Sequence, residues 1–125
     1  MLSSRVFKTK AFRRWADKTG LTDTALLRCV AEMEAGLIHA DLGGGLFKQR
    51  IPLPGSGKSG GARTILATRF GGVCFFLFGF EKNYRDNATP RELALYRRLA
   101  AELLEMNDAQ IAAALAGDVL TEVTP

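Results

Sequence analysis

Cysteine and histidine are scarce in this sequence, whose 125 residues include two cysteines and one histidine. Neither Cys29 nor Cys74 has a second ligand nearby at the spacing of a metal site, so we expect both thiols to be reduced and buried in the core. His39 has no second histidine to work with. A ribonuclease mechanism that uses one histidine as base and another as acid is therefore excluded.

Long apolar runs and acidic clusters are also missing. No segment approaches the length needed to cross a bilayer, and residues 1–15 alternate charged with apolar side chains, unlike the core of a signal peptide. We therefore expect a cytoplasmic protein. The region from Leu46 to Phe80 contains no aspartate or glutamate and offers no ligands for a two-metal nuclease centre. Any cleavage there would be free of metal and cofactor.

Basic residues occupy this same region. The chain is 47% hydrophobic and 24% charged, and a chain of this length fits a single folded domain over residues 1–125. Its net charge is +4, but a partner responds to the local field more than to the total. Five cations lie between Leu46 and Phe80, and they are Lys48, Arg50, Lys58, Arg63 and Arg69. The middle of the chain is therefore suited to bind phosphate groups.

The hydrophobic periodicity predicts an α+β fold. We expect a small antiparallel sheet of three to four strands packed against two N-terminal helices and a C-terminal helix. The capping box Thr89-Pro90-Arg91-Glu92 marks the start of the C-terminal helix, and Gly71-Gly72 marks a hairpin. The predicted strands cover 5–8, 46–51, 62–70 and 73–80; the helices cover about 12–19, 23–36, 90–103 and a short one from 107 to 117, before a tail.

The alternation of side chains places Lys48 and Arg50 on one face of the strand LFKQRI. One plausible register of the next strand places Arg63 beside that pair. Between these strands the loop PLPGSGKSGG lets the backbone approach a ligand closely, with Lys58 as a mobile charge. The segment 82–85, after the last long strand, combines basic, amide and aromatic side chains suited to phosphate contact and base stacking.

The string LFKQRIPLPGSGKSGGARTIL, followed by FGFEKN, resembles the RelE/HigB toxins of type II toxin-antitoxin systems, and in particular their HigB-like branch. The resemblance extends over nearly the whole chain. It implies a RelE-like fold and a ribosome-dependent endoribonuclease that cuts mRNA and inhibits translation. It also implies a cognate antitoxin, of the HigA-like helix-turn-helix type, as partner.

Four residues match the catalytic positions of this family. Lys48 and Arg50 fall on its paired basic strand residues, Arg63 on its transition-state arginine, and Lys82 on its basic pair after the last strand. Asn83 departs from the pattern, since RelE has a second basic residue there, and Ala88 stands where RelE has a tyrosine. Tyr84 or Arg85 would have to replace that function. The residues expected to bind RNA phosphates are Lys58, Asn83, Tyr84 and Arg85.

Two other functions fit the same cations. A toxin similar to ParE, which shares the fold and acts on DNA gyrase, would need no ribonuclease site. A plain RNA-binding module would use Lys48, Arg50, Lys58 and Arg63 for phosphate contacts without catalysis. The paired basic strand residues favour the ribonuclease.

Overall fold

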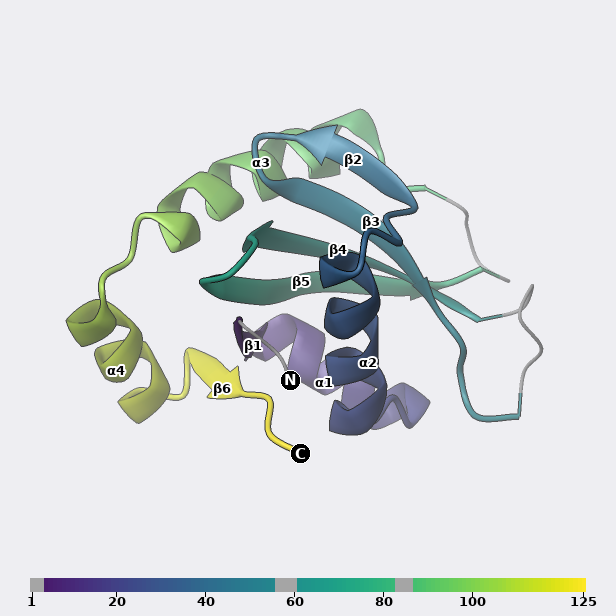
Figure 1. The fold of residues 1–125 in the computed structure, drawn as a ribbon, viewed down its shortest axis with the longest axis horizontal. Coiled ribbons are helices and arrows are strands. Elements are labelled where there is room, and N and C mark those ends of the chain that lie inside the picture. Colours follow the sequence, from purple (N-terminus) through teal and green to yellow (C-terminus); the bar gives the residue numbers. More distant parts are fainter. Residues whose placement is uncertain (1–3, 56–60, 83–86) are drawn as a thin grey trace.

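The computed structural model describes residues 4–55, 61–82 and 87–125 (Figure 1). Their helices and strands are, in chain order, β1 (Arg5–Thr9), α1 (Lys10–Thr19), α2 (Asp23–Glu34), β2 (Ala40–Gly43), β3 (Leu46–Ile51), β4 (Ala62–Arg69), β5 (Val73–Glu81), α3 (Pro90–Leu104), α4 (Asp108–Ala116) and β6 (Leu120–Glu122). None of these helices is both long and apolar enough to span a membrane.

The helices begin where side chains can satisfy their first backbone N–H groups. Thr22 accepts a hydrogen bond from the Ala25 N–H at the start of α2. At α3, the Thr89 side chain accepts from the Glu92 N–H, and the Glu92 carboxylate accepts from the Thr89 N–H. The capping box predicted there is confirmed. These bonds are local in sequence, which is why the four predicted helices could be placed.

The strands form one mixed sheet in the order β2-β3-β4-β5-β1-β6. The α+β class is confirmed, but the predicted sheet of three to four antiparallel strands was wrong. The described residues form six strands, and β1 pairs with β5 in parallel. Two short edge strands were missed. β2, with the sequence ADLG, has no β-branched residue and lies outside the predicted strands, and β6 belongs to the predicted tail.

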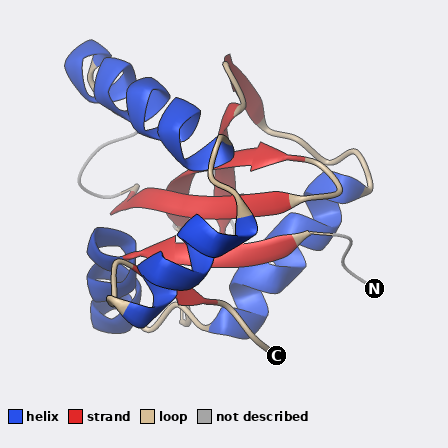
Figure 2. Ribbon diagram, turned by 90° about the vertical axis from the view of Figure 1, so that its left-hand side faces the viewer, coloured by secondary structure: helices blue, strands red, loops and turns tan. Residues whose placement is uncertain are grey.

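Helices cover both faces of the sheet (Figures 1 and 2). Side chains of α1 and α2, such as Phe12 and Leu26, are buried in one core cluster with Phe76 of β5. Side chains of α3 and α4, such as Leu103 and Ile111, are buried in a second cluster with Phe75. Phe75 and Phe76 are neighbours on one strand, so they point to opposite faces. β5 is therefore apolar on both faces.

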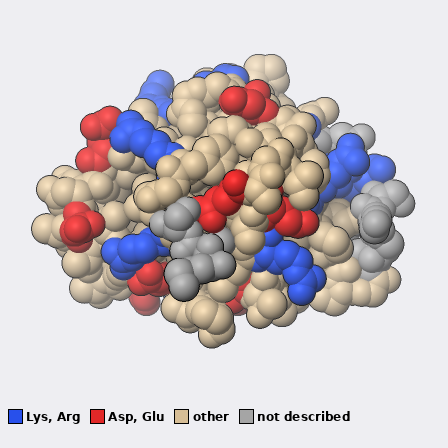
Figure 3. Space-filling view, viewed as in Figure 1, with Lys and Arg blue, Asp and Glu red and all other residues tan. Residues whose placement is uncertain are grey.

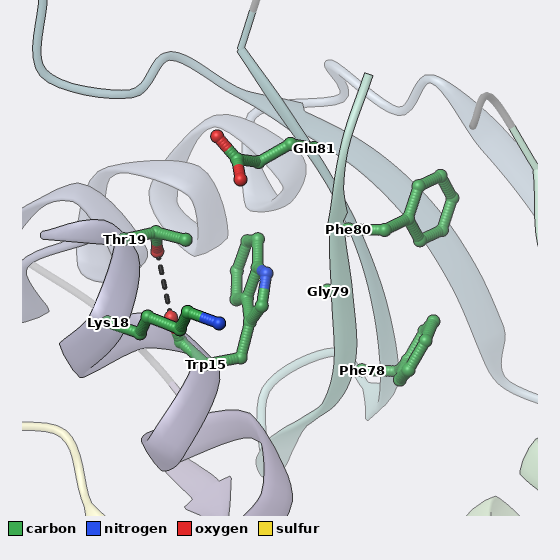
Figure 4. A pocket seen from close by; sticks show the side chains of 7 residues that line it. All are labelled: Trp15, Lys18, Thr19, Phe78, Gly79, Phe80 and Glu81. Carbon is green, nitrogen blue, oxygen red and sulfur yellow. Dashed lines mark hydrogen bonds between the residues drawn. The ribbon is translucent and has the colours of Figure 1, made fainter. Parts of the chain in front are cut away.

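Trp15 of α1 lies against the backbone of β5 at Gly79 (Figure 4). A Cβ atom at Gly79 would overlap the indole ring, so this contact requires glycine. The ring lines a cavity of about 620 Å³ between α1 and β5. Trp15 packs against the first cluster while remaining partly exposed.

Both cysteines are buried, as predicted. Burial in apolar surroundings disfavours the thiolate and raises the pKa of Cys29 to about 12. The pKa of Cys74 is raised further by the same cause. Neither thiol is suited to act as a nucleophile.

Candidate functional site

Two arginines face each other across β3 and β4. In the antiparallel register, Arg50 is paired with Arg63, and Lys48 is paired with Ile65. Paired residues share a face of the sheet, so Lys48, Arg50 and Arg63 lie together on the face that α3 covers in part. The predicted register is therefore confirmed. Like charges directly opposite each other destabilise a sheet, which indicates that something other than stability maintains this pair.

Arg63 is buried although it carries a charge. The residue is 5% exposed, and its Nη1 atom has no hydrogen-bond partner among the described residues. Leaving a buried donor unsatisfied costs about 1–3 kcal/mol, and more for a charged group. A folded protein tolerates such a donor most readily where a ligand completes it. An anion at this position would supply the missing acceptor.

Lys48 is held by a residue that the sequence reasoning missed. Its Nζ atom donates a hydrogen bond of 2.6 Å to Oδ1 of Asn87, in the segment that leads into α3. Asn87 lies 39 positions from Lys48 in the sequence. It belongs to a polar turn that carries no motif, so only the folded chain reveals the contact.

Arg50 is exposed. Its backbone N–H is bound by His39 at the edge of β3 that faces away from β4. The Nδ1 atom of His39 accepts a hydrogen bond of 2.8 Å from the Arg50 N–H. Both residues, with Arg28 and Glu32 of α2, line a cavity of about 630 Å³ between α2 and β3. The sequence indicated no role for His39 beyond the lack of a second histidine.

Lys82 directly follows β5 and is exposed. Its N–H donates to the Gly61 carbonyl at 3.2 Å, which extends the pairing of β4 and β5 by one step. Phe80, two residues earlier, is paired with Arg63. Lys82 therefore lies at the same end of the sheet as the two arginines, as expected for one site.

Lys58, Asn83, Tyr84 and Arg85 were predicted to bind RNA phosphates, and they lie outside the described residues. The fifth cation of the central region, Arg69, is engaged elsewhere. It donates to the Leu104 carbonyl at 3.1 Å and forms an ion pair with Glu105, also at 3.1 Å. Arg69 therefore stabilises the end of α3 at the opposite end of β4.

No ion pair joins Lys48, Arg50 or Arg63 to a carboxylate in the described part of the chain. In Figure 3, basic side chains gather at the end of the molecule where β3 and β4 reach the undescribed residues in Figure 1. Phe78 and Phe80 form an apolar floor on the same face, and the Phe78 ring stacks on Tyr96 of α3 with centroids 5.1 Å apart. In the described part of the chain, three cations that form no ion pair therefore lie on the same face of the sheet as a packed group of aromatic rings.

Such a site can bind a phosphodiester and stabilise additional negative charge on it. Arginine binds two phosphate oxygens at once and remains charged, whereas lysine supplies a proton as well as a charge. Among the described residues, no group of three or more histidine, cysteine, aspartate or glutamate side chains could hold a metal ion.

Comparison with known proteins found a matching family model. The family model described as the RelE toxin of the RelE / RelB toxin-antitoxin system matches residues 4–123. No curated protein sequence matches the chain. The family match spans every strand and helix that carries the candidate site.

Proposed function

The chain belongs to the RelE toxin family, and we propose that it is a ribosome-dependent endoribonuclease that cuts mRNA and inhibits translation. Proteins of this family pair with an antitoxin. The HigB-like subgroup, a HigA-like helix-turn-helix antitoxin, and the ribosome and mRNA as partners are parts of the proposal. The observation that carries it is the Nη1 atom of buried Arg63, which lies opposite Arg50 and has no hydrogen-bond partner in the part of the chain that the structure describes.

In the proposed reaction the RNA supplies its own nucleophile. The 2′-oxygen forms a bond to the adjacent phosphorus as its proton is removed, and the bond to the 5′-oxygen breaks as that oxygen gains a proton. The products are a 2′,3′-cyclic phosphate and a 5′-hydroxyl. No cofactor takes part in this proposal.

Each cation is proposed to have its own role. Arg63, whose Nη1 has no partner among the described residues, is proposed to bind the phosphate, where two negative charges develop in the pentacoordinate intermediate. Arg50 is exposed opposite it and binds the same or the neighbouring phosphate. Lys48 and Lys82 are the candidates for moving the two protons. Lys58, Asn83, Tyr84 and Arg85 are proposed to bind the RNA strand around the cut.

The proposal is tested by primer extension across a reporter mRNA in a reconstituted bacterial translation reaction. Loss of one preorganised donor typically lowers the rate about a hundredfold to a thousandfold, so Arg63→Ala should nearly abolish cleavage. Arg98→Ala removes an exposed arginine from α3 and is the matched control, which should cleave at the normal rate. Ribosome-free mRNA should remain intact.

The outcomes separate the alternatives. Cleavage that requires ribosomes, leaves a cyclic phosphate and disappears in Arg63→Ala supports the proposal. An intact mRNA in the presence of folded wild-type protein would contradict it, and salt-dependent RNA binding without cleavage would then favour the binding module. Inhibition of DNA gyrase would favour the activity known for ParE.

A further inference from the structure

The backbone at Arg50 lies where the pairing of β2 with β3 ends. The last residue pair of this ladder joins Ala40 to Lys48, and β2 begins at Ala40, so no residue of β2 lies opposite Arg50. The Arg50 N–H would otherwise point to solvent at the edge of the sheet. It donates instead to Nδ1 of His39 at 2.8 Å. The imidazole thus replaces the missing strand partner.

His39 is itself held in place by Gln49, the residue before Arg50. Gln49 is 2% exposed; its Oε1 atom accepts from the His39 N–H at 2.7 Å, and its Nε2 atom donates to the Leu37 carbonyl at 3.1 Å. Together with the imidazole bond, these contacts attach the segment before β2 to β3 at three points. The imidazole that binds the Arg50 N–H is therefore itself fixed to β3 through the backbone of its own residue.

We propose that His39 is a positioning residue for Arg50, and that it works in the neutral form with its proton on Nε2. This inference rests on the proposed function, because it concerns the arginine that faces the phosphate. Nδ1 can accept from Arg50 only while it carries no proton. Arg28 and Glu32 of α2 line the same cavity as the imidazole.

Three substitutions at position 39 test this role. In His39→Asn, the amide oxygen can occupy nearly the place of Nδ1 and can accept from the same N–H, whereas in His39→Gln the oxygen lies one bond further out. His39→Ala removes the acceptor. Small displacements of a reacting group lower rates by up to about a hundredfold. We expect His39→Ala and His39→Gln to cut ribosome-bound mRNA about tenfold or more slowly at saturating toxin, and His39→Asn to remain within about threefold of wild type.

Rescue by the conservative variant gives a readout that a purely structural residue would not change. His39→Asn keeps an acceptor for the Arg50 N–H and should cleave nearly as fast as wild type, whereas His39→Ala and His39→Gln should not. Thermal unfolding of each variant confirms that it is folded under assay conditions. Normal cleavage by His39→Ala, or an equal loss in His39→Asn and His39→Ala, would overturn the proposal.

A measurement on the protein alone separates this inference from the proposed function. Nitrogen-15 NMR of the imidazole should show Nδ1 without a proton, and hydrogen exchange at the Arg50 amide should accelerate in His39→Ala but not in His39→Asn. A proton on Nδ1 at neutral pH overturns the inference whatever the activity. An inactive wild-type protein with the expected NMR spectrum overturns the proposed function and, with it, the role of His39 in catalysis.

Discussion

Replacing Arg63 by methionine should make the protein more stable and nearly inactive at the same time. Methionine matches the arginine side chain as far as Nε and has no donors, so it removes the Nη1 atom that has no partner among the described residues. An unsatisfied buried donor costs about 1–3 kcal/mol. Relief of the repulsion between Arg63 and Arg50 adds about 0.2–1 kcal/mol. We therefore expect the free energy of unfolding to rise by about 1–4 kcal/mol.

Urea unfolding measures this change directly, as a higher midpoint with an unchanged slope. A change of 1 kcal/mol corresponds to roughly 4 °C in the melting temperature of a domain of this size. The control is Arg69→Met, which removes an arginine that is already paired with Glu105 and should gain no stability. Cleavage of ribosome-bound mRNA by Arg63→Met should fall about a hundredfold or more.

Two results would refute the reasoning. A clear loss of stability in Arg63→Met would show that the guanidinium supports the fold, so that its burial would be no sign of function. A variant that is more stable and still cleaves mRNA normally would show that the unpartnered donor does not contact the phosphate. Phosphate binding by Arg63 is supported only if Arg63→Met is more stable than wild type and cleaves mRNA more slowly.

Three further predictions concern Asn87, Gly79 and Cys29. Asn87→Ala removes the acceptor that holds Lys48 and should lower the single-turnover cleavage rate about tenfold, with little change in melting temperature. Gly79→Ala places a methyl group against the Trp15 ring and should lower the free energy of unfolding in urea by about 1–3 kcal/mol. Burial raises the pKa of Cys29 from 9.0 to about 12, so this thiol should resist alkylation at pH 9 until the protein is unfolded. Because the unfolded chain loses this proton first, the same group should reduce stability as the pH rises from about 9 to about 12.

The helices could be predicted because their signals are local. The hydrogen bonds between Thr89 and Glu92 join residues three positions apart, and Pro90 suits the first turn of a helix in any context. The hairpin at Gly71-Gly72 is local in the same sense, because the two strands it joins are adjacent in the chain. Such features need no knowledge of the rest of the fold.

The sheet was only partly predictable because its edges depend on distant partners. Nothing in the residues of β1 states that they pair in parallel with β5, which lies 68 positions further along the chain at Arg5 and Val73. The short β2 (ADLG) has low strand propensity and is a strand because β3 offers it hydrogen bonds. Tertiary pairing therefore overrode local preference in β2, whereas in β1 it decided which strand a correctly predicted strand pairs with.

The sequence by itself determined the identity of the cations and the face on which two of them lie. Alternation along β3 places Lys48 and Arg50 together because side chains on a strand repeat every two residues. Only the tertiary structure decided that Arg63 is buried with a donor that has no partner among the described residues, that Asn87 holds Lys48, and that His39 holds the backbone of Arg50. These contacts join residues brought together by burial of the two apolar faces of the sheet, and that burial depends on the whole chain at once.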